Sequence, residues 1–207
     1  MPRPAQPPEV RHAIRRERLV ERLLLVIDDL LLDAGSFGEL RIDEVIAAAG
    51  IARSTFYRYF EDKTELLLAL SGTAVREVIE AADRLLALPP TATRDGVREL
   101  ARETVGTFAA HVALLGALSE LAASDRRAAA ALRRSFGLAQ QRAAARIAEA
   151  QRLGTARPDI DADAVAGWLT WMVERGMQQL VADAGDDQRL RLEHALADII
   201  WFTVSGR

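Results

Sequence analysis

Cysteine is absent from this chain of 207 residues, which excludes disulfide bonds, thiolate catalysis and a cysteine-ligated zinc site. The three histidines, His12, His111 and His194, lie far apart and lack the HxxxH or HExxH spacing of a metal site. The longest apolar run near the start, residues 23–27, is far short of the roughly 20 residues that a membrane span needs. The proline-rich first residues also lack the apolar segment of a secretory signal. We therefore expect a cytoplasmic protein that needs no cofactor, binds no metal and has no membrane partner.

Strand-like runs of alternating valine, isoleucine and threonine are nearly absent, whereas the helix formers alanine, leucine, arginine and glutamate dominate. Hydrophobic residues make up 50% of the chain, enough for a sizeable core. These features predict an all-α fold. Apolar periodicity and glycine or proline breaks predict helices over residues 9–34, 42–49, 53–59, 63–88, 93–111, 112–123, 125–153, 161–184 and 188–204. The pattern indicates a small three-helix head followed by a larger helical bundle.

Aromatic residues are few, only 5% of the chain, yet the segment "GIARSTFYRYFEDK" at residues 50–63 holds both tyrosines and two of the six phenylalanines. Two arginines and no acid occur between residues 50 and 60, although the net charge of the protein is −3. Two short helices joined at Gly50, with a third helix behind them, are typical of a helix-turn-helix. Because charges are screened over about 8 Å at physiological salt, a locally basic site is compatible with an acidic protein.

The second of these short helices carries hydrogen-bond donors suited to a DNA backbone and to base edges. We expect Phe56 and Phe60 to be buried and Tyr57 and Tyr59 to face DNA. Lys63, the only lysine, would reach the phosphate backbone from the start of the next helix. The alternative is an amphipathic helix whose aromatic residues belong only to the core. The arginines at 11–22 are mixed with glutamates, so a solvated face is as compatible as phosphate contact.

The stretch "LRIDEVIAAAGIARSTFYRYFEDKTELL" resembles the DNA-binding head of the TetR family of bacterial transcriptional regulators, over about residues 10–70. The resemblance implies a homodimeric regulator, expected to be a repressor, that binds a palindromic operator in double-stranded DNA and is released by a small lipophilic effector. It implies a flexible arm at 1–8, a DNA-binding helix-turn-helix domain at 9–62 and a ligand-binding and dimerisation domain at 63–207. The matching DNA-contact positions are Arg41, Arg53, Ser54, Thr55, Tyr57, Tyr59 and Lys63.

Three positions depart from the family pattern. Arg41 stands where a Thr or Ser usually caps the helix, so Asp43 or water must satisfy the free N–H groups. Ala52 replaces a capping Ser, a loss of about 1 kcal/mol. Ile46 stands where a small residue is usual.

Residues 93–206 resemble the EthR-type subgroup of that family, whose bundle holds a lipophilic channel. The matching channel positions are Leu100, Thr104, Phe108, Phe136, Ala139, Thr170, Val173 and Trp201. Ordinary core packing is as compatible with each of these apolar residues taken singly. In the family the last two helices form the dimer interface. Glu174 and Arg175 could anchor a ligand or pair with each other, and we favour the pair.

Of two other function classes, the sequence argues against one and leaves one open. An enzyme on a helical scaffold finds no support, since no nucleophile–base arrangement occurs and Ser36 lacks the elbow context of a hydrolase. A helical interaction protein without DNA binding is motivated by Ala52 and Ile46. For the regulator we expect effector entry to displace the 93–111 helix and swing the 63–88 helix.

Overall fold

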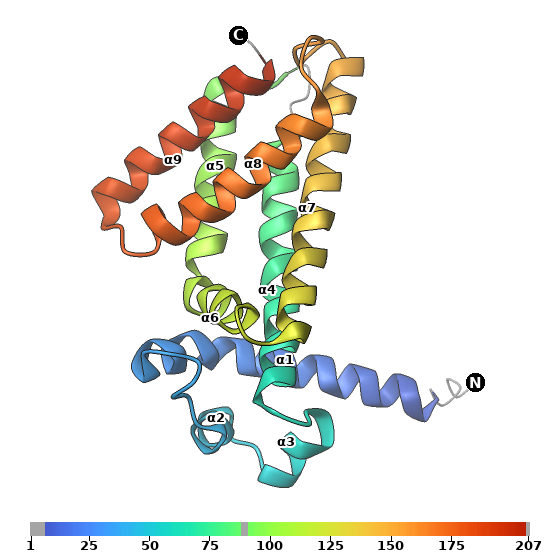
Figure 1. The fold of residues 1–207 in the computed structure, drawn as a ribbon, viewed down its shortest axis with the longest axis vertical. Coiled ribbons are helices and arrows are strands. Elements are labelled where there is room, and N and C mark those ends of the chain that lie inside the picture. The colour runs from blue at the N-terminus through green and yellow to red at the C-terminus, as the bar shows by residue number, and fades with distance from the viewer. Residues whose placement is uncertain (1–6, 88–90, 206–207) are drawn as a thin grey trace, which may run out of the picture.

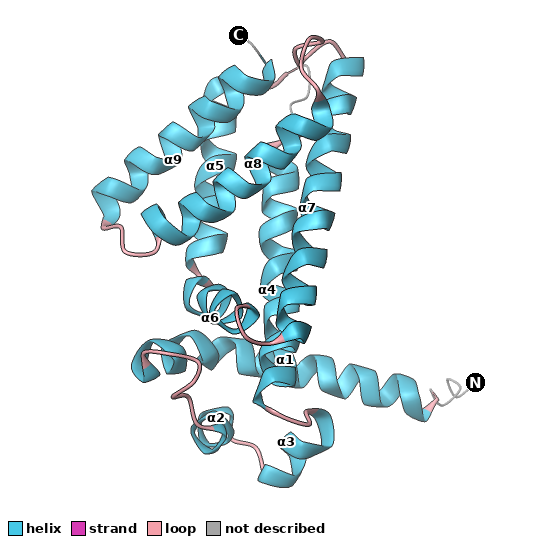
Figure 2. Cartoon of the chain, in the orientation of Figure 1, coloured by secondary structure: helices cyan, strands magenta, loops and turns pink. Residues whose placement is uncertain are grey.

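The computed structural model describes residues 7–87 and 91–205, and within these ranges every regular element is helical (Figure 2). This confirms the expected all-α fold, with a three-helix head and a larger bundle. Most of the predicted arm, residues 1–6, lies outside the described residues, and the first helix already begins at Pro8. In Figure 1 the first helix crosses beneath the bundle, and the two short helices lie below it.

The head consists of α1 (Pro8–Ala34), α2 (Ile42–Ala49) and α3 (Arg53–Tyr59), within one residue of the predicted bounds. Gly50 ends α2 with φ of 60° and ψ of 41°, the left-handed conformation that side chains with a Cβ disfavour. Gly35 ends α1 in the same way, with φ of 74°. The glycine positions in the sequence therefore fix where both helices stop.

The head is held together by buried side chains from all three helices. Val45 of α2 and Phe56 of α3 are completely buried, and they belong to one cluster with Leu23 of α1. Leu66 and other buried residues of α4 (Lys63–Leu85) join the same cluster. Because α4 contributes to the core of the head before it enters the bundle, the head and the bundle are connected through one continuous helix.

The bundle continues with α5 (Arg94–Ala109), α6 (Val112–Ala122), α7 (Arg126–Arg152), α8 (Ala162–Gly176) and α9 (Asp186–Ile200). In Figure 1, α4, α5 and α7 extend away from the head, and α8 crosses in front of them. A second buried cluster, which includes Ile147 and Ala197, lies toward the end farther from the head. Within the described ranges no single helix has the length and hydropathy of a membrane span; α5 and α6 meet that test only together, across a bend of 64°.

Two predicted α-helices end differently from the expectation. α8 continues into a π-helical turn, η1 (Met177–Val181), in which the N–H of Ala182 donates to the carbonyl of Met177 at 3.2 Å. α9 continues into a second π-helical turn, η2 (Trp201–Ser205). Such turns change the angular spacing of side chains along a helix and occur often at functional sites.

Candidate nucleic-acid interface and apolar cavity

One face of α3 is open to solvent and rich in hydrogen-bond donors. Arg53, Ser54 and Arg58 are exposed, and Tyr57 is 46% exposed. Phe56 and Phe60 lie on the opposite face, at 0% and 1% exposure, so the predicted burial of the phenylalanines is confirmed. This separation leaves a polar face on α3 to which the helix itself contributes no acid, while the buried phenylalanines anchor the helix to the core of the head.

The other two predicted contacts on α3 are less accessible. Thr55 and Tyr59 are both half-buried, and Tyr59 packs against the head core. The Tyr59 ring lies 4.8 Å from the ring of His12, centroid to centroid, which joins the end of α3 to α1. Tyr59 therefore has a packing role in the head that its position in the motif did not indicate.

Arg53 is held by groups of the head itself. Its Nη1 donates to Oδ1 of Asp43 at 2.5 Å, which ties α3 to α2. Its Nη2 lies 3.5 Å from the Tyr57 hydroxyl, and its guanidinium lies 5.5 Å from the centre of the Tyr57 ring. The three side chains form one connected group on the exposed surface, here called the Arg53 group (Asp43, Arg53 and Tyr57).

Glu44 stabilises the start of α2 through the residue that precedes the helix. Glu44 Oε2 accepts from the backbone N–H of Arg41 at 3.1 Å, and the Arg41 side chain makes no capping hydrogen bond and is exposed. Asp43 or water was expected to satisfy the free N–H groups of this turn; Asp43 pairs with Arg53 instead, which leaves the water alternative as a prediction. Ala52 has no side-chain capping bond to α3, as expected.

The structure gives Lys63 a set of internal partners. Its ammonium donates to the carbonyl oxygens of Phe37, Gly38 and Leu40, at 2.6, 3.0 and 3.0 Å. These three bonds use all three ammonium hydrogens. Burial lowers the pKa of Lys63 from its usual value, with an opposing effect from the charge of Glu120. In this arrangement Lys63 holds the loop before α2, and its contact with a phosphate stays a prediction.

Two of the α1 arginines also serve the head. Arg22 donates to the carbonyl of Ala49 at 2.5 Å, next to the end of α2. Arg16 lies 3.4 Å from Glu65, and its guanidinium lies 5.2 Å from the centre of the Phe60 ring. The sequence did not separate these structural arginines from the solvated ones.

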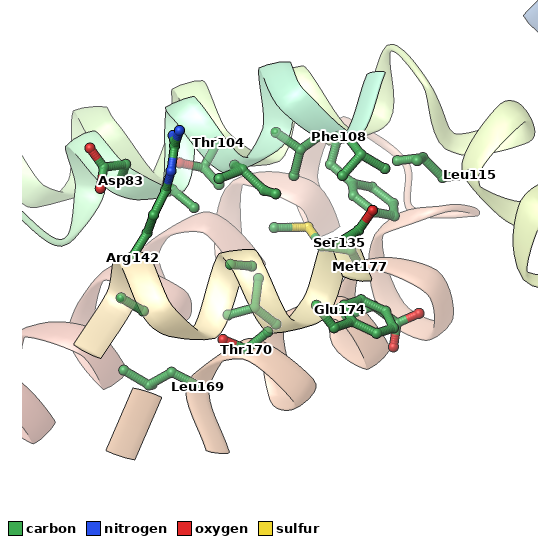
Figure 3. A pocket seen from close by; sticks show the side chains of 18 of the residues that line it. Asp83, Thr104, Phe108, Leu115, Ser135, Arg142, Leu169, Thr170, Glu174 and Met177 are labelled. Carbon is green, nitrogen blue, oxygen red and sulfur yellow. The ribbon is translucent and has the colours of Figure 1, made fainter. Parts of the chain in front are cut away.

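An apolar cavity of about 140 Å³ lies inside the bundle, bounded by α4 to α8, by η1 and by Ile200 of α9 (Figure 3). Six of the eight predicted channel residues line it: Thr104, Phe108, Phe136, Ala139, Thr170 and Val173. The other two, Leu100 and Trp201, do not line it, and their part in a channel stays a prediction. Leu100 packs against the second buried cluster, and Trp201 is 8% exposed within that cluster.

Three polar side chains of the cavity wall, those of Asp83, Thr104 and Ser135, are hydrogen-bonded to other groups of the protein. Asp83 accepts two bonds from Arg146, at 2.9 and 2.5 Å. The hydroxyls of Thr104 and Ser135 donate to the carbonyls of Leu100 and Ala131 in their own helices. These three side chains therefore already have hydrogen-bond partners within the protein.

Glu174 differs from them. Its Oε2 is buried and has no hydrogen-bond partner among the described residues, and burial raises the pKa of this carboxyl, against the charge of Arg175. The predicted ion pair between Glu174 and Arg175 does not form in the described part of the chain. Figure 3 shows Asp83 and Arg142 together on the left of the view and Glu174 apart from them, to the right of the centre.

A histidine connects the head to the bundle. His111 precedes α6, and its Nε2 lies 2.9 Å from Glu77 of α4. Its Nδ1 lies 3.7 Å from Asp28 of α1, and the other Asp28 oxygen accepts from the N–H of Leu114 at 3.0 Å. The carboxylates of Asp28 and Glu77 raise the pKa of His111, against the effect of burial. Three helices thus meet at one titratable group.

The outer surface of α8 and α9 is apolar and open. Trp168 is 80% exposed, and Trp171, Leu180, Ile199 and Phe202 are also exposed. The Trp171 ring lies 4.6 Å from the ring of Phe136, a cavity residue. In the described residues no group of three or more His, Asp or Glu side chains could hold a metal ion.

Comparison with known proteins agrees with this architecture. A model of bacterial regulatory proteins of the tetR family matches residues 31–70, the helix-turn-helix region. Among curated relatives, the HTH-type transcriptional regulator EthR of Mycolicibacterium smegmatis is 30% identical over 168 residues, which are 79% of this chain and 75% of that protein.

Solved structures show the same fold. A TetR-family regulator from Mesorhizobium loti is 16% identical, with a TM-score of 0.70 over 92% of this chain and 98% of its own. A transcriptional regulator from Saccharomonospora viridis, solved in complex with choline, is 20% identical, with a TM-score of 0.68 over 94% of this chain and 100% of its own. With the identity to EthR over this span, the chain belongs to the TetR family of DNA-binding transcriptional regulators, a family of non-enzymatic proteins.

Proposed function

We propose that the protein is a repressor that binds a palindromic operator as a homodimer and leaves it when a small lipophilic effector enters the bundle. One observation carries this proposal. α4 contributes Leu66 to the core of the head, and further along it contributes Val78 to the wall of the apolar cavity. A single helix therefore connects the donor-rich face of α3 to a site for a small molecule.

The proposed DNA contacts follow from accessibility. Arg53, Ser54 and Tyr57 are exposed on α3 and would enter the major groove, and Arg41 would contact phosphate at the start of α2. Thr55 and Tyr59 are half-buried and would reach DNA only at the edge of the interface. Lys63 is proposed to act by holding the 37–40 loop, because its three donors are bound there.

The proposed homodimer forms through α8 and α9. Exposed large apolar side chains on a soluble protein mark interaction sites when they gather on one surface. Trp168, Leu180 and Phe202 gather there, and tryptophan is prominent among residues that carry binding energy. A two-fold axis through this surface would present two heads to successive major grooves, about 34–36 Å apart.

The proposed effector binds in the cavity. Its wall is largely apolar, and a volume of about 140 Å³ is close to that of a cavity that holds benzene. That the Saccharomonospora viridis regulator of the same fold forms a complex with choline supports a small-molecule ligand for this protein. Entry between α4 and α5 would displace α5 and swing α4, which changes the spacing of the two heads. A difference of a few kcal/mol between the two states suffices for release.

The proposal is tested by selecting bound duplexes from a random pool and measuring their affinity by fluorescence anisotropy. We expect a palindrome with half-sites one helical turn apart, and an affinity that falls with salt by about 0.9 logarithmic units per phosphate neutralised. The double variant Arg53→Ala/Tyr57→Phe should lose most operator affinity, whereas Arg134→Ala on the exposed face of α7 should not. A selection without consensus, together with a flat salt dependence, would favour a helical interaction protein instead.

A further inference from the structure

We infer that the cavity takes an apolar organic cation, whose positive group lies beside the Glu174 carboxylate while its apolar body fills the space between α4, α5 and α7. This inference deepens the proposed function, because it names the chemical class of the effector. It starts from a difference between the two acids of the cavity wall, because Glu174 lacks the charged partner that Asp83 has.

The difference is visible group by group. The described lining contains two acids, Asp83 and Glu174, and one arginine, Arg142. Asp83 is bound by both nitrogens of the Arg146 fork, so its charge is already compensated. Glu174 has no such partner on Oε2, and that atom is inaccessible to solvent. Of the two acids in the lining, Glu174 is therefore the one without a hydrogen-bonded cation.

A buried carboxylate oxygen without a hydrogen-bond donor costs free energy, because it has lost its hydrogen bonds to water and has gained none from the protein. Two things can relieve that cost: a proton on the carboxyl, or a positively charged donor beside it. Burial raises the pKa of Glu174, so this carboxyl holds a proton more readily than an exposed one. A bound cation would replace that proton and form a charge-assisted hydrogen bond of the stronger kind.

The surroundings of Glu174 also suit a cation. Phe136 lines the same cavity, and the face of an aromatic ring attracts a positive charge within about 6 Å. Phe136 is fixed by its contact with Trp171, whose ring centroid lies 4.6 Å away. Aromatic and apolar walls exclude water, which strengthens the attraction between the carboxylate and a cation.

The end of the cavity that holds Arg142 and Asp83 is a poor site for an anionic ligand. Arg142 is exposed, so its charge is screened by solvent and salt. It also lies on the same side of the cavity as Asp83 (Figure 3), whose carboxylate would oppose an anion. An anionic ligand would thus meet only a rim arginine, whereas a cation meets a carboxylate oxygen that is already desolvated.

The volume of about 140 Å³ fits a molecule with one ring or a short branched chain. Suitable probes are benzylammonium, benzyl alcohol and benzoate, which share a ring and differ in charge. Binding of each probe to the full chain is measured by titration calorimetry at pH 7.5 without DNA. We expect benzylammonium to bind about tenfold more tightly than the other two probes, the effect of one charge-assisted hydrogen bond.

The variant Glu174→Gln should reduce this preference to about twofold or less, since the amide keeps the shape and removes the charge. Because the amide of the glutamine variant could itself bind the probes, Glu174→Leu is measured as a second variant. We expect it to lose the preference for the cation to the same extent. The matched control is Glu80→Gln, an exposed acid of α4 outside the cavity, which should keep the full preference. Melting curves of the variants confirm that each is folded.

The inference is overturned if the wild-type protein binds the three probes equally, prefers benzoate, or binds no benzylammonium at about 10 mM. It is also overturned if Glu174→Gln keeps the preference for the cation. None of these results bears on operator binding, which is measured without effector. Conversely, if no operator is selected, the charge preference of the cavity can still be measured. Failure of the proposed function and failure of this inference are therefore distinguishable.

Discussion

The ammonium of Lys63 lies 2.6 Å from the carbonyl oxygen of Phe37 and 4.6 Å from the centre of the Phe37 ring. The first residue of α4 is thereby bound to the loop that leads into α2. Any rotation of the start of α4 would act on this loop directly. The contact makes Lys63 a mechanical link between the bundle and the helix-turn-helix.

The variant Lys63→Met should lower the free energy of unfolding by about 2 kcal/mol, because three carbonyls lose a charged donor. Urea denaturation followed by circular dichroism measures the change. The control Arg15→Met removes an exposed cation of α1 and should change the stability by less than about 0.5 kcal/mol. A Lys63→Met protein as stable as the control would show that the three hydrogen bonds contribute nothing net.

The pair of Asp43 and Arg53 predicts a change in DNA selectivity. Asp43→Asn removes a negative charge from the surface that is proposed to contact DNA, so the affinity for a non-operator duplex should rise about threefold. Arg53 at the same time loses the partner that orients it, so the ratio of operator to non-operator affinity should fall about tenfold. Anisotropy with both duplexes measures the ratio. Asp33→Asn, an exposed acid at the end of α1, is the control and should leave the ratio unchanged.

The helices of the head could be predicted from the sequence because local signals define them. Glycine at position 50 permits the left-handed backbone that ends α2, and the helix boundary agrees with the expectation. Phe56 and Phe60 are spaced to share one face of α3, and both are buried as expected. The partners of Lys63 and Asp43 could not be predicted in this way. Each contact joins elements whose mutual orientation is set by tertiary packing, and no local pattern encodes it.

The cavity was predicted in part for a related reason. Thr104 and Phe108 are one turn apart and both line it, but Leu100, one further turn away, meets the second buried cluster. Helical spacing says which residues share a face, and the crossing of neighbouring helices decides where the cavity along that face ends. Trp201 lies in a π-helical turn, where the spacing of 3.6 residues no longer applies.

His111 predicts a pH dependence of stability. The pKa of this histidine is raised above its usual 6.5, mainly by Asp28, so the folded protein binds the proton more tightly than the unfolded chain. The stabilisation is complete below pH 6.5 and is lost as pH rises through the folded pKa. His111→Gln should therefore destabilise most at pH 6, and the difference from wild type should shrink toward pH 9. Melting temperatures across this range test it, with His194→Gln, on α9, as the control.

Glu174 predicts a dependence tied to its own carboxyl. Burial raises the pKa of Glu174 above its usual 4.5, so the neutral form stabilises the fold and the charged form opposes it. Its contribution is complete below pH 4.5 and is lost as pH rises through the folded pKa. Glu174→Gln should thus be more stable than wild type at pH 7.5, by about 1 kcal/mol or a few degrees in Tm. This advantage should disappear as the pH approaches 4.5, whereas a constant difference would contradict the assigned ionisation.

The proposed dimer surface is tested by placing a charge on it. Trp168→Arg puts a guanidinium on the exposed apolar face of α8, where pairing across a two-fold axis would bury it against its own copy. We expect the wild-type chain to sediment as a dimer and Trp168→Arg to sediment as a monomer at about 10 μM, a loss of at least tenfold in dimer affinity. Leu25→Arg is the matched control, because Leu25 is 82% exposed but lies on α1, away from this surface. The monomeric variant should keep its helical content and bind a single half-site weakly. If Trp168→Arg remained dimeric, the dimer interface would have to lie elsewhere on the protein. The way in which α4 could change the spacing of the heads would then differ as well.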